Sequence, residues 1–351
     1  DPVREDLVAF YKRYYHASRM ALSVIGNQSL DQLQAWVKEK FSAIPGDGED
    51  YAPFVQQLVP DDKLPIQLTL KPIKDTRSVT FSFPVESLQA DMDSKPGQYL
   101  SNLLGHEGEG SLLATLKERA WANGLSAGVG YSDDVQATFD IKISLSELGL
   151  ENVDEIGKLV FSEIELIRKQ GVRKDYFEEQ KKLADIDFRF QEKSSETGLV
   201  QGVASRLHRY PAQQVLSLPY RFKRYAPDRI EAILKRLNPD NLQLIIVDPG
   251  LDSAQKTDWY NVAYQIADIN PDWLNDWRAT KPVAELALPA PNPFIPDQLK
   301  LLDPPAQAMR KPVKLDAPSG VGVWYQTRVD FEQPKAELYF TLRSAIANGS
   351  P

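Results

Sequence analysis

Residues Leu103–Gly130 read LLGHEGEGSLLATLKERAWANGLSAGVG, and they carry more information than any other stretch of the chain. Ser111 is a favourable N-cap for a helix whose apolar residues recur at helical spacing. The segment LSAGVG that follows Gly124 predicts a strand with little side chain to cover its main chain. A glycine-rich loop, a short helix and a bare strand together suggest a place where a peptide could be held through its main chain.

The charged residues of the loop do not form a convincing metal site. His106 stands beside Glu107 and close to Glu109, but neighbouring side chains point in different directions and three ligands from one tight loop rarely share a tetrahedral site. The chain has only three histidines, and the other two, His16 and His208, are far away in the sequence. No H-x-x-E-H motif is present, so we expect no catalytic residue and no metal ligand here.

Composition limits the class of protein. The net charge of −8 argues against nucleic-acid binding, and the absence of cysteine excludes disulfides and a cysteine nucleophile. No apolar run approaches the length of a membrane span. With 351 residues the chain is too long for one ordinary domain, and its acidic opening DPVRED is not a secretory signal, which suggests a fragment or a processed chain.

The chain divides into four predicted parts. Residues 1–50 form a helix, a strand (18–26) and a second helix, too few to enclose a core, and read as the tail of a truncated domain. Residues 55–250 have strands early and late with helices between them, which predicts an α+β domain: an antiparallel sheet covered on one face by helices. The predicted strands lie at 66–73, 77–85, 125–130, 135–146 and 241–248, and the helices at 111–120, 152–171, 174–191, 197–209, 212–218 and 227–237.

The last two parts differ in composition. Residues 251–318 hold a helical segment and a proline-rich linker, because nine of the 25 prolines fall between 282 and 318. In residues 319–351, VGVWYQTR and AELYFTLRS predict a strand pair, read as the first strands of a further truncated domain.

The chain resembles the pitrilysin/insulinase family of zinc metallopeptidases, collinearly over nearly its whole length. Four stretches carry the resemblance: FYKRYYHASRMALSVIGNQSLDQL, LLGHEGEGSLLATLKERAWANGLSAG, PDRIEAILKRLNPDNLQLIIV and LPAPNPFIPDQLKLL. The family is built from similar α+β domains of the LuxS-like peptidase type, arranged as two bowls around a chamber. The first domain binds zinc through an inverted motif and a distal glutamate, and the second lacks those ligands.

The resemblance implies what this chain contributes. It would be the end of the first domain, the whole second domain, the linker between the halves and the start of the third. Zinc would lie in the first domain, outside this chain. The partners would be peptide substrates and the remaining catalytic and C-terminal domains of the parent metalloendopeptidase.

The implied substrate-binding residues belong to the loop and the strand of the opening stretch. They are Gly105, His106, Glu107, Gly108 and Gly110, followed by Leu125, Ala127, Gly128 and Val129. Several relatives carry a second histidine four residues before the loop histidine, where this chain has Asn102, which puts a pocket with two imidazoles in doubt. A purely structural turn remains an alternative.

The expected function is therefore the non-catalytic, substrate-binding middle region of a zinc-dependent endopeptidase that hydrolyses peptides. The alternative is a scaffold or peptide-binding module from a parent without the zinc motif. The compartment is open: a bacterial source, which the absence of cysteine suits, would favour the periplasm, and any other source the cytoplasm.

Overall fold

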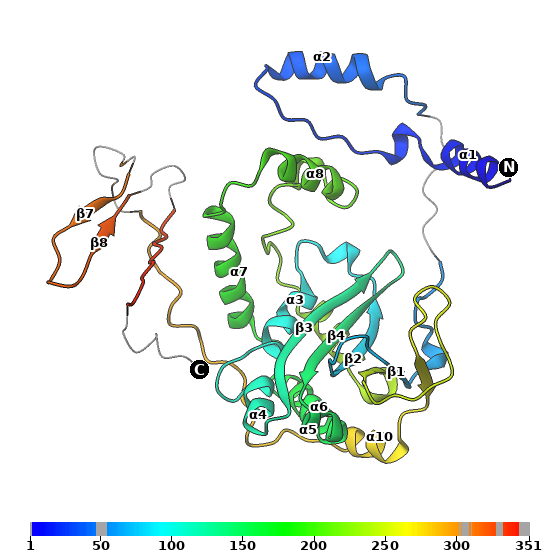
Figure 1. The fold of residues 1–351 in the computed structure, drawn as a ribbon. Coiled ribbons are helices and arrows are strands. Elements are labelled where there is room, and N and C mark those ends of the chain that lie inside the picture. The colour runs from blue at the N-terminus through cyan, green and yellow to red at the C-terminus, as the bar shows by residue number, and fades with distance from the viewer. Residues whose placement is uncertain are drawn as a thin grey trace.

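The computed structural model describes residues 2–46, 55–301, 303, 309, 311–327 and 333–343. Its central part is a twisted sheet with helices behind it (Figure 1), while the N-terminal helices and a small C-terminal strand pair lie outside this body. The strands are β1 (Ile66–Leu70), β2 (Ser78–Glu86), β3 (Ala122–Ser132), β4 (Gln136–Leu145), β5 (Gln243–Val247), β6 (Tyr264–Ala267), β7 (Val313–Leu315) and β8 (Val323–Tyr325).

Helices surround and connect these strands. The α-helices are α1 (Pro2–Tyr14), α2 (Leu30–Phe41), α3 (Pro96–Leu104), α4 (Leu112–Glu118), α5 (Glu147–Glu151), α6 (Val153–Gln170), α7 (Lys174–Arg189), α8 (Glu196–Arg206), α9 (Pro227–Arg236) and α10 (Pro271–Arg278). Short 3-10 turns are η1 (Ala17–Arg19), η2 (Asp61–Lys63), η3 (Gln89–Asp91), η4 (Ala212–Gln214) and η5 (Pro239–Asn241).

The large sheet has six strands in the order β3-β4-β2-β5-β1-β6. All neighbours are antiparallel except β1 and β5, which run parallel. The α+β class is thus confirmed, and the sheet is antiparallel as predicted at every pair except β1 with β5. The sheet is mixed because β5 lies between β1 and β2. The helical segment α5–α9 precedes β5, and a connection of that length permits a parallel pair.

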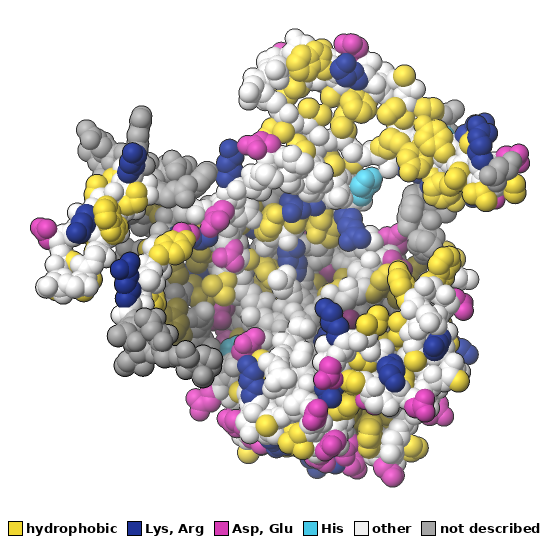
Figure 2. Space-filling model, in the orientation of Figure 1, with side chains coloured by type: hydrophobic (Ala, Val, Ile, Leu, Met, Phe, Trp, Pro, Cys, Tyr) yellow, Lys and Arg dark blue, Asp and Glu magenta, His cyan; other side chains and the backbone are white. Residues whose placement is uncertain are grey.

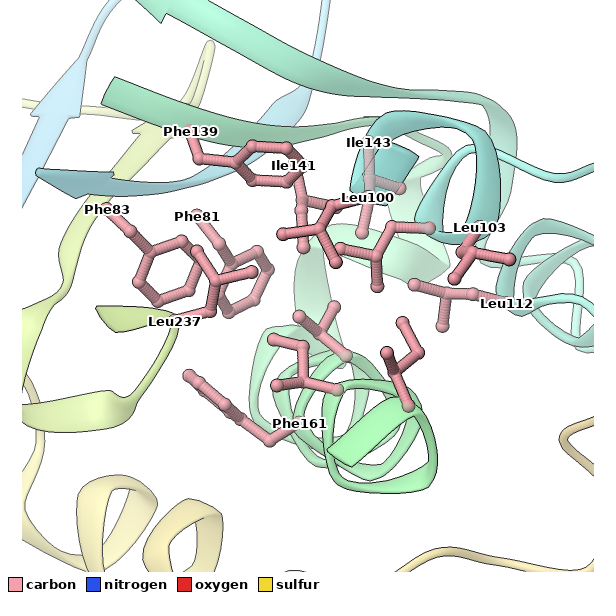
Figure 3. Close-up of a cluster of buried hydrophobic side chains, with 14 of the residues drawn as sticks. Phe81, Phe83, Leu100, Leu103, Leu112, Phe139, Ile141, Ile143, Phe161 and Leu237 are labelled. Atoms are coloured by element: carbon pink, nitrogen blue, oxygen red, sulfur yellow. The ribbon is translucent and has the colours of Figure 1, made fainter. Parts of the chain in front are cut away.

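The core lies between this sheet and the helices on one of its faces. Alternating side chains of β2 and β4 meet leucines of α3 and α4 and Phe161 of α6 (Figure 3), as expected where strand and helix periodicities face each other. Trp277 of α10 is buried against the same cluster, and its indole nitrogen donates to the Asp154 carbonyl oxygen at 2.9 Å.

Several helix ends agree with the sequence. Ser29 and Ser111 cap α2 and α4 through their hydroxyl oxygens, with acceptor distances of 3.3 and 3.2 Å. The long helix α6 ends at Gly171, whose φ of +74° is a conformation that glycine adopts without strain. The predicted helix at 212–218 is wrong in extent, since only the single turn η4 is helical there.

The N-terminal segment makes no core of its own. Neither α1 nor α2 contains a buried residue, and large side chains such as Phe10 and Trp36 are exposed. The strand predicted at 18–26 is wrong, because among the described residues no other strand lies beside that extended segment, and a strand needs a pairing partner.

The C-terminal strand pair also differs from the prediction. β8 pairs with β7 rather than with 336–344, and no strand is assigned within 333–343. The tight turn at Pro318–Gly320, with φ of +86° at Gly320, brings β7 and β8 together locally.

The proline-rich segment 281–297, here named the strap, runs over the body without regular secondary structure and is held by polar contacts along its length. The contacts are Ser162 to Lys281 and Val283, Gly110 to Ala287, Tyr176 to Pro289, Glu179 to Asn292 and Lys182 to Asp297, at distances of 2.9 to 3.0 Å. The strap is therefore a docked segment rather than a free linker.

Candidate functional site

Strand β3 is the outermost strand of the large sheet, and no other strand of the described residues lies beside its outer main chain. It pairs with β4, in a register that places Ala127 opposite Ile141 and Val129 opposite Phe139. Its predicted site residues are partly accessible, and Val129 is 42% exposed. An accessible edge strand is a template to which another extended chain can pair.

Helix α3 lies close beside β3 because its facing residues are small. Gly97, Ser101 and Gly105 are four residues apart and share one helical face. A Cβ atom added at Gly97 would lie 2.6 Å from a methyl carbon of Val129, and one at Gly105 would lie 3.6 Å from the Ala127 nitrogen. A side chain at Gly97 would therefore collide with the strand, whereas at Gly105 the tight contact is with the Ser101 carbonyl oxygen, 2.7 Å from an added Cβ.

A side chain that sequence reasoning missed joins the two elements. The Ser101 hydroxyl donates a hydrogen bond to the Ala127 carbonyl oxygen. It also lies close to Gly128, where an added Cβ would be 3.0 Å from the hydroxyl oxygen. One acceptor of the predicted binding strand is therefore already engaged within the chain.

The glycine loop begins where α3 ends. Gly105 is the C-cap, and its amide donates to the Ser101 carbonyl oxygen at 2.9 Å. The Gly108 amide donates to Nδ1 of His106 at 3.1 Å, so in the neutral ring the proton is on Nε2, which is a donor. A Cβ at Gly108 would lie 2.5 Å from the imidazole carbon Cε1, so a side chain there would require the His106 ring to move.

The far end of the loop has a different role. Gly110 has φ of +75°, and its carbonyl oxygen accepts from the Ala287 amide of the strap at 2.9 Å. A Cβ at Gly110 would lie 3.0 Å from the Ala287 methyl carbon. The predicted site residue Gly110 is thus part of the packing between loop and strap.

The structure brings some predicted residues together and leaves others apart. Gly105 lies against β3, whereas Glu107 is exposed and has no hydrogen bond or ion pair with any residue described. Glu109 is likewise exposed and unpaired within that part of the chain. The two glutamates of the loop are therefore not held in place by neighbouring side chains of the described residues.

The described residues do not fit a zinc ion. Nowhere in the described ranges, which omit 47–54 and parts of the region after 301, do three or more His, Cys, Asp or Glu side chains gather closely enough to hold a metal. No reaction step through a metal is assigned to these residues. Over the same ranges no helix is long and apolar enough to cross a bilayer.

Comparison with known proteins identifies the family. Residues 2–183 match the model described as the Peptidase M16 inactive domain, and residues 188–351 match the middle or third domain of the same peptidases. The chain belongs to the M16 peptidase family. The model that matches residues 2–183 is described as inactive, so the chain is a non-catalytic region of a protease.

Relatives of the M16 chain extend over almost all of it. It is 36% identical over 354 residues to the insulin-degrading enzyme of Drosophila melanogaster, covering 99% of this chain and 36% of the relative. It is 32% identical over 353 residues to the human insulin-degrading enzyme, covering 99% of this chain and 34% of the relative. The chain therefore spans about a third of the length of these relatives, and their eukaryotic origin lends no support to the expected bacterial source.

Solved structures agree on the fold. The crystal structure of pitrilysin superposes with a TM-score of 0.82 at 24% identity, covering 95% of this chain and 36% of that one. An M16 inactive domain from Pseudomonas fluorescens gives a TM-score of 0.51 at 18% identity, covering 72% of this chain and 59% of that one. At these identities the likeness concerns the fold alone.

Proposed function

We propose that this region of an M16 peptidase holds an extended peptide substrate by its N-terminal end, along the edge of β3 and against the loop Gly105–Gly110. The observation that carries the proposal is the position of β3 as an accessible edge strand beside that loop. A peptide added there would gain main-chain hydrogen bonds with little dependence on its side chains. Such a site suits a protease region that must position varied peptides.

The loop would complete the site. His106 presents an Nε2 donor, and Gly105 brings the loop against Ala127, so a peptide end beside β3 would meet both main-chain and imidazole groups. Holding a peptide by its end restrains the rest of the chain, and restraint of this kind favours reaction at a distant catalytic group.

The arrangement of the whole protein is part of the proposal. Residues 1–50 would complete a preceding zinc-binding domain, 55–250 would be the inactive domain, 251–318 the helical and strap region and 319–351 the beginning of a third domain. The six-stranded sheet extends somewhat further, since β6 at Tyr264–Ala267 pairs with β1. A curated relative in Schizosaccharomyces pombe is named a putative zinc protease, which supports placing zinc in the catalytic domain of the whole protein.

Fluorescence anisotropy with a labelled ten-residue peptide tests the anchoring. Because Ala127 packs against the Gly105 end of α3, replacing it with leucine should push the loop away from β3 and weaken binding. His106→Ala should weaken binding further by removing a donor, by up to about tenfold. A matched control is Ser126→Ala, a change at the exposed neighbouring position of the same strand.

The peptide itself provides a second control. Methylation of successive backbone nitrogens removes hydrogen-bond donors without altering the protein. Binding that persists through every methylation, or that is unchanged in both Ala127→Leu and His106→Ala, would overturn main-chain anchoring at β3.

A further inference from the structure

A small pocket opens at the end of β3 that is remote from the glycine loop. It has a volume of about 220 Å³ and is lined by Val129 and Ser132 of the strand, by the start of α3 and by Arg209 and Tyr210. Pockets that take whole small ligands are larger, about 300–1,000 Å³. The volume instead suits one side chain of a peptide that continues along the strand.

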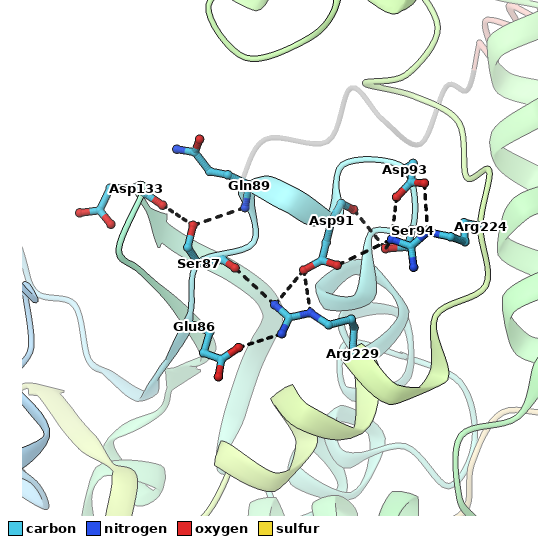
Figure 4. Close-up of polar contacts among 9 residues, drawn as sticks. All are labelled: Glu86, Ser87, Gln89, Asp91, Asp93, Ser94, Asp133, Arg224 and Arg229. Atoms are coloured by element: carbon cyan, nitrogen blue, oxygen red, sulfur yellow. Dashed lines mark hydrogen bonds and ion pairs between the residues drawn. The ribbon is translucent and has the colours of Figure 1, made fainter. Parts of the chain in front are cut away.

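Carboxylates around this pocket are already engaged by arginines (Figure 4). Asp91, which lines the pocket and is 4% exposed, accepts from two nitrogens of Arg229 at 2.9 and 2.8 Å. Asp93 accepts from two nitrogens of Arg224 at 3.1 and 3.0 Å. These pairs largely neutralise the acidic charge nearest the pocket.

Two basic side chains of the lining remain without such a partner. Among the described residues, neither Lys95 nor Arg209 forms an ion pair. The Lys95 amine donates to the Pro219 carbonyl oxygen at 3.0 Å, which leaves two of its three donors for a ligand. Burial lowers the pKa of Lys95, and an incoming carboxylate would offset that cost of desolvation.

Local conformation and hydrogen bonds position the main chain of both basic residues beside the pocket. Lys95 has φ of 48° and ψ of 54°, a left-handed conformation that residues with a Cβ rarely adopt. Arg209 and Tyr210 are held by amide hydrogen bonds to the Arg206 carbonyl oxygen at the end of α8, at 2.9 and 2.8 Å. Figure 2 shows several basic side chains in the upper and right part of the central hollow, with acidic ones on its left rim and over the lower part of this face.

We propose that this pocket receives a side-chain carboxylate of the bound peptide, held by Lys95 and Arg209, so that the region prefers peptides with an acidic residue near their anchored end. The inference rests on the proposed anchoring along β3. Tyr210, whose phenol can donate a hydrogen bond, would add a neutral contact.

The spacing along β3 sets the position of that acidic residue. Gly105 lies against Ala127, whereas the pocket is lined by Val129 and Ser132, two and five residues further along the strand. At about 3.3 Å per residue these two positions average about 12 Å from the loop contact, which corresponds to about four residues of extended peptide. The preferred acid should therefore lie about four residues from the end that the loop holds.

The test measures binding of labelled ten-residue peptides in which one glutamate is moved from position 2 to position 7, each paired with a glutamine counterpart. The 351-residue chain should bind the glutamate peptide about fivefold more tightly than its counterpart when the acid is near position 4, and equally elsewhere. Lys95→Met should remove the preference, and Arg209→Glu, a change at an exposed side chain, should reverse it in favour of a lysine peptide.

A charge-matched control is Lys74→Glu. Lys74 precedes Ser78, the opposite end of β2 from Glu86, and should leave the preference unchanged. Equal binding of glutamate and glutamine peptides at every position, or a preference that survives Arg209→Glu, would overturn the pocket while leaving β3 anchoring intact. Failure of every peptide to bind, the glutamine series included, would overturn the anchoring and the inference with it.

Discussion

The Ser101 hydroxyl on α3 donates to the Ala127 carbonyl oxygen on β3, the strand to which we assign peptide anchoring. The contact ties the helix to the strand near the middle of β3. It also engages an acceptor that a peptide bound along β3 would use. Ser101 would thus compete with such a peptide for the Ala127 carbonyl oxygen.

Removing that competitor should strengthen peptide binding. Ser101→Ala deletes the hydroxyl while keeping a small side chain against β3, and one hydrogen bond contributes about 0.5–1.5 kcal/mol. We expect affinity to rise severalfold, up to about tenfold, in the anisotropy assay. Unchanged or weaker binding by a folded Ser101→Ala chain would show that the Ala127 carbonyl takes no part in anchoring.

The contact between loop and strap should be visible in stability. Gly110→Ala places a Cβ at a φ of +75° and 3.0 Å from the Ala287 methyl carbon, so we expect a loss of about 1–2 kcal/mol in the free energy of unfolding. Gly124→Ala is the matched control, because no atom lies within 4 Å of its added Cβ. That variant should be neutral or slightly stabilised, and equal effects of the two in urea titrations would contradict the assigned role of Gly110.

The sequence predicted some elements of the fold well and others not at all. The strand and helix periodicities of β2, β4 and α6, together with the caps Ser29 and Ser111, follow from local pattern and agree with the structure. The parallel pairing of β1 with β5 and the pairing of β7 with β8 depend on which distant segments meet, and local pattern does not contain that information.

The candidate site was likewise predicted only in part. The glycine loop and the bare strand stand out in the sequence, but the role of Gly110 in holding the strap required a partner 177 positions away, at Ala287. Ser101 had a usable signal, because Gly97, Ser101 and Gly105 recur every fourth residue and mark a helix face that a backbone can approach. Lys95 and Arg209 lie far apart in the sequence, and no local pattern marked either of them as part of a site.

A buried glutamate gives the fold a predictable pH dependence. Burial raises the pKa of Glu163, on α6, from 4.5 to about 8, and Glu163 Oε2 has no hydrogen-bond partner among the described residues. Between these two values the unfolded chain loses this proton while the folded chain keeps it. The folded state therefore becomes less stable as pH rises through that range, by up to a few kcal/mol.

Glu163→Gln removes the titration and keeps the shape of the side chain. The variant should be more stable than the parent chain at pH 8 and nearly equal to it at pH 4.5. Urea titrations across that range measure the difference, and parallel stability curves for the two proteins would contradict a protonated buried Glu163.

Metal removal should leave this region unaffected. Since the described residues offer no group of three metal ligands, dialysis against a chelator should change neither the unfolding midpoint nor peptide affinity. A fall in either, restored by added zinc, would reveal a structural metal site that the described residues do not account for.

The most direct test of the account follows amide hydrogen exchange with and without a saturating peptide. Anchoring predicts slower exchange confined to β3 (Ala122–Ser132) and the loop Gly105–Gly110, because peptide pairing there would protect main-chain amides. Peptide binding that leaves exchange in both segments unchanged, or that protects only a surface elsewhere, would contradict the proposal that this M16 region holds its substrate along the β3 edge.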